Sequence, residues 1–284
     1  MINPSGRTII SLLIFFQLLL SCQNDNSKSA PHKGLPVAEK KVSKPSYNTM
    51  LQALHLLQKD PLLKNASLGY MVVDVTAKDP VIVADYHAKQ LMMPASTLKI
   101  FVTGAALEYF GKPIIPEVTI TNQMSVNWRS SKLLRKIGGK IYNTATTAAG
   151  TKAILDFWAT KGIDTEGMNF YDGNGLSRNN AISPKQLVDA LYVMRTSPYF
   201  QAFYESLPLA GLTGTLHKAM KGSAAEGRIR AKTGTIGKVK SFAGYVVTVT
   251  GRKLIFSLIV NNFDCRVKLM KKKLEAVMIT MAEI

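Results

Sequence analysis

The stretch MPASTLKI, residues 93–100, holds the pattern from which the rest of the chain can be interpreted. Ser96 and Lys99 lie three residues apart, where the apolar run that follows predicts a helix. In the simplest interpretation Ser96 caps that helix and Lys99 is solvated, since serine is a favoured cap and lysine is common on helices. In the alternative, Ser96 is a nucleophile and Lys99 is its base, because residues i and i+3 share a helix face. The pattern alone does not distinguish the two.

The composition is that of a globular protein with a basic surface. The chain has 284 residues, of which 46% are hydrophobic, and this is enough for a sizeable core. The formal charge of +18 is spread along the chain, which is typical of a solvated surface and would favour anionic surroundings such as phospholipid headgroups or acidic cell-wall polymer. The chain has neither a zinc-finger spacing nor a Walker loop, so we expect no nucleic-acid partner.

The N-terminus has the pattern of a secretory signal. Arg7 precedes an apolar stretch that is too short to span a membrane and ends in Ser21 and Cys22. We predict a signal peptide over residues 1–21. The sequence LLSC is similar to a bacterial lipobox, in which the cysteine is lipidated and becomes the first mature residue; ordinary signal cleavage is the alternative. The prediction is therefore a periplasmic or cell-envelope lipoprotein, secreted across the inner membrane and held to a membrane by a lipid anchor on Cys22.

A tether and one domain follow the signal. Residues 22–46 are polar, contain Pro, Lys and Ser without a period, and are predicted to be a flexible tether. Residues 47–284 are predicted to form one compact domain. Cys265 is the only cysteine in that domain, and a lipidated Cys22 cannot pair with it, so we expect no internal disulfide.

Strand-like runs lie near both ends of the predicted domain, and most of the predicted helices lie between them. This order indicates an α+β fold in which one antiparallel sheet is built from both termini and a helical lobe is inserted in its middle. The strand-like runs lie within 67–88 and at 227–235, 240–250 and 253–263. Helices are predicted over 47–58, from about 96 to 111, over 130–138, 150–162 and 183–197, and in a last segment rich in Lys and Met.

Two further motifs change the interpretation of residues 93–100. Lys232-Thr233-Gly234 lies in a strand-like run. The combination of S-x-x-K, S-x-N and K-T-G occurs in serine enzymes that act on penicillin or peptidoglycan. Each motif alone is a weak signal, and two S-x-N matches compete: Ser125-Val126-Asn127 and Ser177-Arg178-Asn179.

The chain resembles the class C low-molecular-mass penicillin-binding proteins, the secreted D-alanyl-D-alanine carboxypeptidases and endopeptidases. The resemblance covers nearly everything from about residue 48 onward and implies the fold of serine β-lactamases and penicillin-binding transpeptidases. In that family the S-x-N motif and a D-G-x-G-L-S-R stretch are separate, and the stretch comes after the S-x-N helix. Ser177 lies in the stretch that matches D-G-x-G-L-S-R, so the resemblance favours Ser125 and Asn127 over Ser177. The stretches that carry it are LKNASLGYMVVDV, MPASTLKIF, SVNWRSSKLLRKIGG, YDGNGLSRNNAISP, LPLAGLTGTL and RAKTGTIGKVKSFAGYV.

One departure from the family lies between the first two motifs. Relatives carry a long insertion between the S-x-x-K helix and S-x-N, whereas here only residues 100–124 separate Lys99 from Ser125. We therefore expect a DD-peptidase domain over 47–284 that lacks the usual large insertion, and with it part of the helical framework that presents S-x-N. The alternative is a non-catalytic relative that binds muropeptide or a protein partner.

The resemblance implies a serine peptidase that acts on peptidoglycan stem peptides and is inhibited by β-lactams. Ser96 would attack the carbonyl group between two D-alanines and form an acyl-enzyme. Lys99 would take the hydroxyl proton, which requires that burial and nearby positive charge lower its pKa. Ser125 would relay the proton to the departing D-alanine, and Asn127 would orient Lys99 and the peptide amide.

The remaining implied residues bind the substrate. Lys232 and Thr233 would hold the terminal carboxylate. Gly234 would keep the strand edge open, so that the substrate backbone can lie against it. The backbone N–H groups of Ser96 and Thr235 would form the oxyanion hole.

Other residues invite functional readings that we do not favour. We expect Asp172 to organise the Gly-rich turn rather than act as a base. Glu166 invites comparison with the deacylating glutamate of class A β-lactamases, but their pattern is E-x-x-x-N and Asn169 comes one residue too early. A β-lactamase is therefore the less favoured alternative. We expect neither a metal nor another cofactor, because the four histidines are scattered and none has ligand spacing: His32, His55, His87 and His217.

Overall fold

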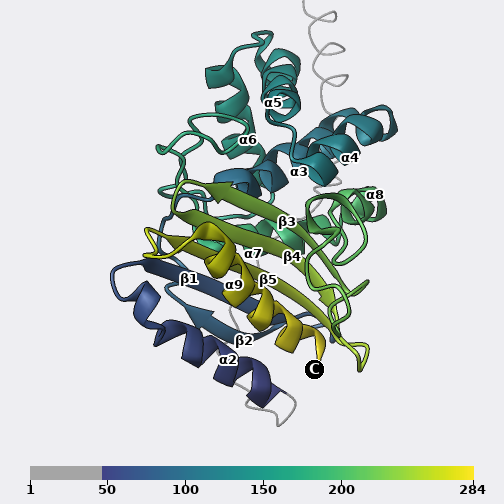
Figure 1. Cartoon of the computed structure of the whole chain (residues 1–284). Helices are drawn as coiled ribbons and strands as arrows, with labels where there is room; N and C mark the ends of the chain where they lie inside the picture. The colour runs from purple at the N-terminus through teal and green to yellow at the C-terminus, as the bar shows by residue number, and fades with distance from the viewer. Residues whose placement is uncertain (1–46) are drawn as a thin grey trace, which may run out of the picture. The chain divides into compact units, whose positions relative to one another are not determined.

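The computed structural model describes residues 47–284, and their strands form one antiparallel sheet in the order β2-β1-β5-β4-β3 (Figure 1). β1, from the N-terminal part of this region, pairs with β5 from its C-terminal part. Both ends of the domain therefore build the sheet, as predicted. The strands are β1 (Ser67–Asp74), β2 (Val81–Tyr86), β3 (Ile229–Ile236), β4 (Val239–Val247) and β5 (Lys253–Asn261).

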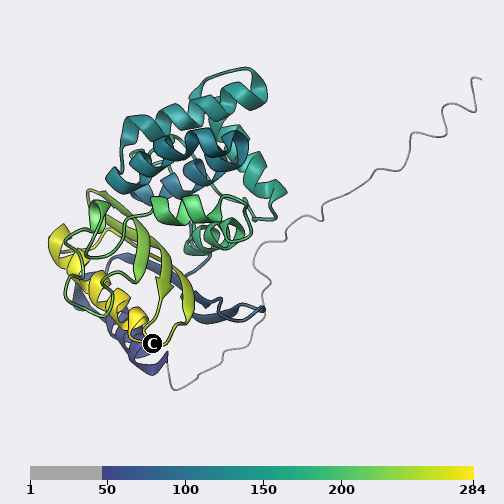
Figure 2. The same ribbon diagram turned by 90° about the vertical axis from the view of Figure 1, so that its right-hand side faces the viewer.

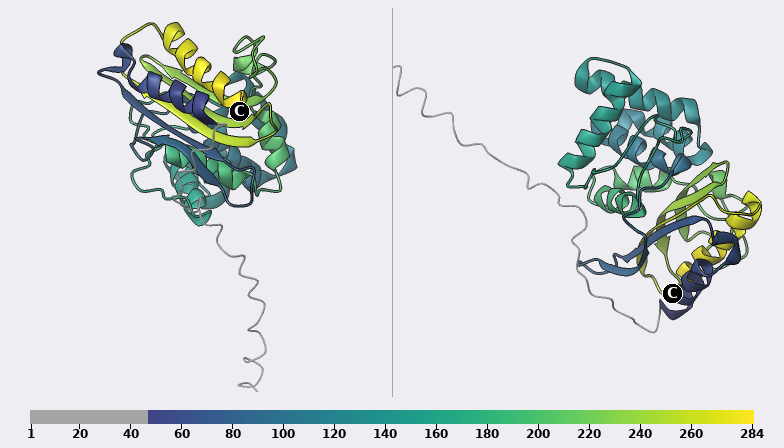
Figure 3. Two further views of the ribbon diagram at one scale, coloured as in Figure 1. Left: turned by 90° about the horizontal axis from the view of Figure 1, so that it is seen from below. Right: turned by 90° about the vertical axis from the view of Figure 1, so that its left-hand side faces the viewer.

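Helices cover both faces of the sheet (Figures 2 and 3). α2 and α9, from the two ends of the described chain, contact each other and cover one face. The other helices lie on the opposite face, where α7 contacts β1, β4 and β5. The helices are α2 (Asn48–Gln58), α3 (Lys99–Phe110), α4 (Ile115–Met124), α5 (Asn127–Tyr142), α6 (Thr147–Thr160), α7 (Pro184–Met194), α8 (Phe200–Ser206) and α9 (Val267–Ala282).

The strand side chains alternate between two hydrophobic cores. On β1, Met71 and Val73 belong to the core that the inserted helices share, whereas Tyr70 and Val72 belong to the core beneath α2 and α9. Because β1 is buried on both faces, its sequence is a nearly continuous apolar run rather than an alternating one. The predicted α+β fold, with a helical lobe inserted into an antiparallel sheet, is confirmed.

Two helices in the inserted part were not predicted. The sequence interpretation assigns no helix to α4 or α8, and both are present. The sequence of α4, IPEVTITNQM, is rich in β-branched residues, which have a lower helix propensity. Pro116 lies in its first turn, where a missing N–H costs nothing, and Val118 and Thr121 are fully buried. Packing against the lobe therefore outweighs the weak local preference.

Several predictions concern residues that lie outside 47–284. These are the signal peptide over 1–21, the lipidation of Cys22 and the tether over 22–46. Within the described region, none of the helices has both the length and the apolar character needed to cross a membrane.

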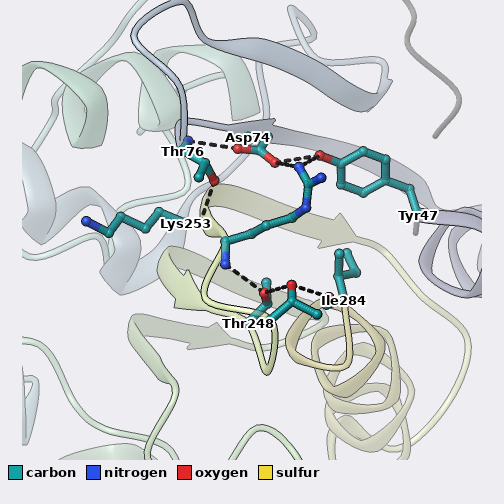
Figure 4. A network of polar contacts seen from close by, with 8 residues as sticks. Tyr47, Asp74, Thr76, Thr248, Lys253 and Ile284 are labelled. Atoms are coloured by element: carbon teal, nitrogen blue, oxygen red, sulfur yellow. Dashed lines mark hydrogen bonds and ion pairs between the residues drawn. The ribbon is translucent and has the colours of Figure 1, made fainter. Parts of the chain in front are cut away.

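A polar network joins the start of the described chain to the far end of the sheet (Figure 4). The hydroxyl of Tyr47, just before α2, donates to the carboxylate of Asp74 at the end of β1. Arg252, just before β5, donates to the same Asp74 oxygen at 2.9 Å, and the N–H of Thr76 donates to the other oxygen at 2.8 Å. The network ties the start of α2 to the neighbouring strands β1 and β5, because Tyr47 directly precedes α2, Asp74 ends β1 and Arg252 directly precedes β5.

We expect Asp74→Asn to lower the free energy of unfolding at pH 7 by about 1.5–3 kcal/mol, the range for lost hydrogen bonds to a charged group. Burial alone would raise the pKa of Asp74, but hydrogen bonds from Thr76, Tyr47 and Arg252 hold it below its ordinary value. Such a group stabilises the fold above the unfolded pKa, about 3.9, and loses that contribution as the pH falls through the folded pKa. The destabilisation should therefore shrink in acid.

Urea unfolding at about pH 7 and about pH 3 measures this difference. Asp79→Asn is the matched control, since Asp79 is exposed in the turn that follows β1. A destabilisation of Asp74→Asn that is the same at both pH values would contradict the assignment of the effect to the ionised carboxylate.

Candidate active site

Strands β4 and β5 hold the turn that carries Ser96. Ala95–Leu98 forms a 3-10 turn directly in front of α3, which begins at Lys99 rather than at the predicted Ser96. Ser241 on β4 donates to the carbonyl of Pro94 at 2.6 Å. The side chain of Asn261 on β5 bonds both the N–H and the carbonyl of Met93, at 2.9 and 3.0 Å. These contacts fix the turn from the sheet side, and Ser96 itself stays partly exposed.

Lys99 is fully buried, so the interpretation in which it is a solvated surface residue is wrong. Its amino group donates to Ser96 Oγ at 2.7 Å, to Asn127 Oδ1 at 2.9 Å and to the carbonyl of Asn174 at 2.5 Å. Burial lowers the pKa of Lys99 to about 7, although the negative charge of Asp172 acts in the opposite direction. A large share of Lys99 is therefore neutral near pH 7, and a neutral amine can accept the proton of a neighbouring hydroxyl.

Ser125 and Asn127 lie at the sharp junction between α4 and α5. Ser125 follows α4 and has a left-handed backbone, with φ 56° and ψ 38°, and Asn127 is the first residue of α5. Left-handed backbone in a residue other than glycine is uncommon and is often found at functional sites. The junction directs Asn127 to Lys99 and Ser125 to Lys232, whose amino group lies 2.8 Å from Ser125 Oγ.

The end of α4 is held by the inserted helices themselves. Asn122 is fully buried and donates to Ser206 Oγ at 2.8 Å, and Gln123 donates to the carbonyl of Leu207 at 3.1 Å. These bonds lie two and three residues before Ser125. Contacts between α4 and the end of α8 therefore support the S-x-N turn.

The competing S-x-N match lies in a separate turn. Among the hydrogen bonds of residues 47–284, none joins Ser177 or Asn179 to Lys99 or Lys232. Instead the N–H of Asn179 donates to Ser177 Oγ at 3.1 Å, and the N–H of Ser177 donates to the Asp172 carboxylate at 2.7 Å. The structure thus brings Ser125 and Asn127 to the two lysines and leaves Ser177 and Asn179 outside.

The Gly-rich turn contributes a residue that the sequence interpretation missed. The Asp172 carboxylate accepts hydrogen bonds from the N–H groups of Asn174, Gly175 and Ser177, which confirms that it organises this turn. The turn presents the carbonyl of Asn174 to Lys99. Gly175 has φ +86°, and a Cβ atom there would lie 2.0 Å from the carbonyl oxygen of Ala95. Its glycines were the available signal for this close approach to the Ser96 turn.

Strand β3 supplies the K-T-G residues at the edge of the sheet. Lys232 is fully buried, and burial followed by the charges of Lys99 and Lys240 lowers its pKa well below the ordinary value. A Cβ atom on Gly234 would lie 2.2 Å from Ser241 Oγ and 3.0 Å from the N–H nitrogen of Ser96. Gly234 therefore lets β3 pack directly against the Ser96 turn. This requires glycine more strictly than the expected role of keeping the strand edge open.

The side chains of Thr233 and Thr235 on β3 form hydrogen bonds with two further residues. Thr233 donates to Thr215 Oγ1 at 3.0 Å, and Thr235 accepts from the Lys240 amino group at 2.6 Å. Thr235 is exposed and Thr233 is partly exposed, so this stretch of strand can be reached from solvent. Thr215 and Lys240 lie in stretches that carry the family resemblance, but neither belongs to S-x-x-K, S-x-N or K-T-G, and the sequence interpretation gave neither a role.

Other candidate groups lie away from this arrangement. Glu166 is exposed, and within the described region its side chain makes no hydrogen bond to any of the site residues. No set of three or more His, Cys, Asp and Glu side chains within 47–284 is grouped so that it could hold a metal ion. His32 lies outside the described residues. The groups that converge are the hydroxyls of Ser96 and Ser125 and two buried amines, together with the Asn127 amide and the Asn174 carbonyl.

Comparison with known proteins relates this arrangement to one family. The profile of the D-Ala-D-Ala carboxypeptidase 3 (S13) family matches residues 50–115 and 111–282. A D-alanyl-D-alanine carboxypeptidase from Actinomadura sp. (strain R39) is 38% identical over 145 residues, which are 49% of this chain and 27% of the relative. Carboxypeptidase DacB from Mycolicibacterium smegmatis is 30% identical over 156 residues, 53% of this chain and 34% of that protein. The chain thus spans about a quarter to a third of the length of these relatives.

Solved structures share the fold at low sequence identity. Penicillin binding protein 4 from Haemophilus influenzae, in complex with a β-lactam, superposes with a TM-score of 0.71 at 14% identity, over 81% of this chain and 98% of that one. The TLA-3 extended-spectrum β-lactamase gives a TM-score of 0.67 at 14% identity, over 83% and 98% of the two chains. These likenesses establish the predicted β-lactamase and penicillin-binding fold.

Lys99 is expected to titrate near pH 7 in the folded protein, because burial removes the ammonium form from water. NMR of protein labelled with ¹³Cε-lysine follows each amino group through a pH titration, and the signal that is missing in Lys99→Met identifies Lys99. An ordinary lysine pKa, about 10.4, would show that the site is hydrated and would contradict its assignment as a base.

Proposed function

The chain belongs to the D-Ala-D-Ala carboxypeptidase 3 (S13) family, and we propose that it is a serine-type D-alanyl-D-alanine carboxypeptidase or endopeptidase acting on peptidoglycan stem peptides. One observation carries the proposal: the buried amino group of Lys99 lies 2.7 Å from Ser96 Oγ. A serine hydroxyl becomes an effective nucleophile when a general base lies within hydrogen-bond distance of it. The relatives that are named carboxypeptidases support the assignment.

In the first step, neutral Lys99 accepts the hydroxyl proton of Ser96 as Oγ bonds to the carbonyl carbon between two D-alanines. The pKa of about 7 allows Lys99 to be neutral before the step and to hold the proton after it. The backbone N–H groups of Ser96 and Thr235 donate to the oxygen that becomes negative. Fixed donors of this kind contribute about 3–4 kcal/mol each in other hydrolases.

In the second step, the C–N bond breaks and the departing amine takes a proton from the Ser125 hydroxyl. Lys232 lies 2.8 Å from Ser125 Oγ and replaces that proton. The product is an ester between Ser96 and the remaining peptide. A water molecule then attacks the ester carbonyl and breaks its bond to Ser96 Oγ. Lys99 returns the proton that it holds to Ser96 Oγ, and the proton that the water loses restores Lys232.

The same amine serves in binding. Lys232 and Thr233 hold the terminal carboxylate of the substrate, while Asn127 orients Lys99 and the peptide amide. An arriving carboxylate favours the charged form of Lys232, which burial and the neighbouring lysines disfavour in the free protein. β-Lactams bind in the same way and acylate Ser96, because their ring amide resembles the D-Ala-D-Ala terminus.

The inserted segment of the relatives is not needed for this arrangement. The two stretches matched by the family profile meet at residues 111–115, between Lys99 and Ser125, and we propose that the usual large insertion is missing there. Because α4 still delivers Ser125 to Lys232, the shortened connection gives little support to a non-catalytic relative. The exposed position of Glu166 gives no support to a β-lactamase.

We expect penicillin to form one covalent adduct, on the peptide that contains Ser96. Intact-mass spectrometry followed by peptide mapping locates the adduct. Ser96→Ala should show none, and the matched control Ser177→Ala should react like the wild type, since Ser177 lies outside the site. A folded wild-type protein without an adduct would overturn the proposed mechanism and favour the non-catalytic alternative.

We also propose that the mature protein is a periplasmic or cell-envelope lipoprotein. The support is the sequence of residues 1–46 alone: an apolar signal over 1–21, the lipobox-like LLSC, and a polar tether. Mass spectrometry of protein extracted from membranes should find a lipid-modified Cys22 at the mature N-terminus. A mature N-terminus at another residue, without lipid, would mean ordinary signal cleavage.

A further inference from the structure

A third buried lysine, Lys240, lies next to the site and belongs to none of the S-x-x-K, S-x-N and K-T-G motifs. Lys240 on β4 is directly opposite Thr235 on β3 in the antiparallel ladder, so their side chains share one face of the sheet. Lys240 is only 4% exposed. Its amino group donates to Thr235 Oγ1 at 2.6 Å and lies 4.7 Å from the centre of the Phe242 ring.

Thr235 lies where few other bonds hold the backbone, so a hydrogen bond to its side chain matters for its position. β3 is the edge strand of the sheet, so it has a ladder partner on one side only. Thr235 is also the second-last residue of β3, next to the turn at Gly237 and Lys238. Strand ends at an edge open more easily than central strands, because fewer bonds hold them. Besides the ladder to β4, Lys240 provides the hydrogen bond to the Thr235 side chain.

Lys240 is itself firmly placed. It lies on the face of the sheet covered by α9, where the charges of Lys271 and Glu275 act on it. Burial, and then the charge of Lys271, lower the pKa of Lys240 to about 8, while Glu275 opposes the shift. Its charge also contributes to lowering the pKa of Lys232. Burying an amine is costly unless the amine is paired. The partner of the buried Lys240 amine is the hydroxyl of the exposed Thr235.

We propose that Lys240 is a positioning residue for the reaction: its hydrogen bond to Thr235 Oγ1 fixes the end of β3, so that the Thr235 N–H points at the oxyanion. The inference rests on the proposed function and deepens it. Lys240 does not touch the substrate. It acts through Thr235, and it should therefore affect the rate of acylation more than the binding of the ligand that precedes it.

The test is the kinetics of acylation by a fluorescent penicillin, which separate the rate constant of acylation from the dissociation constant of the preceding complex. Lys240→Met keeps the length of the buried side chain and removes its donor. We expect the acylation rate constant to fall by about 10- to 100-fold, since a misplaced catalytic group costs up to about 100-fold. The dissociation constant should change by less than about threefold. Lys240→Arg, which keeps a cationic donor, should recover part of the rate.

Two further variants show whether the effect passes through Thr235. Thr235→Val removes the acceptor Oγ1 but keeps the backbone N–H, so it should slow acylation as Lys240→Met does. The double variant should be no slower than either single one, because both changes break the same contact. Lys238→Met is the matched control: it removes a lysine from the same hairpin, where Lys238 bonds the carbonyl of Cys265 instead.

Several outcomes would overturn the proposal. Wild-type acylation by Lys240→Met would do so, and so would an equal loss in Lys238→Met, which would indicate a general effect of charge. Additive losses in the double variant would separate Lys240 from Thr235. Should Lys240→Met not fold, Thr235→Val provides the test, since it breaks the same contact from the acceptor side. If wild-type protein is not acylated at all, the proposed function fails first, and the role of Lys240 fails with it.

Discussion

The site depends on the burial of two lysine amino groups, those of Lys99 and Lys232, within reach of each other's charge. Burying even one ammonium group is expensive, and two buried together repel each other. The fold meets this constraint by giving each amine hydroxyl and carbonyl partners rather than carboxylates. Burial therefore lowers the pKa of both amines, that of Lys99 to about 7; in the mechanism we propose, Lys99 acts as the base and Lys232 becomes charged when the substrate carboxylate binds.

The two structural parts of the domain each contribute one side of the site. The sheet supplies Lys232 from its edge strand and fixes the Ser96 turn through β4 and β5. The inserted helices supply Ser125 and Asn127 from the sharp α4–α5 junction. Two glycines, Gly175 and Gly234, let the parts approach closely, since a Cβ atom at either position would collide with the turn around Ser96. The positions of the polar groups therefore follow from backbone packing.

Much of this could be predicted from the sequence, because the motifs are local. Ser96 and Lys99 are one helical turn apart, and the strand pattern of the residues around Lys232 is enough to place that lysine on a strand. The helix α4 could not be predicted, since its β-branched residues have a weak local preference and its stability comes from buried contacts such as Val118. The carbonyl of Asn174 could not be predicted either, because a backbone group leaves no mark in the choice of side chain.

By itself, the sequence determined the chemical groups of this protein, the order of its strands and the positions of most of its helices, since these follow from residue type and short-range periodicity. Only the tertiary structure showed that Ser125 and Asn127, the pair that the resemblance favours, lie at the lysines, that Lys99 is buried rather than solvated, and that Lys240 donates to Thr235. Those features depend on distances between segments far apart in the chain. Such distances are set by how the helices and the sheet edge pack, and no local pattern of residues encodes them.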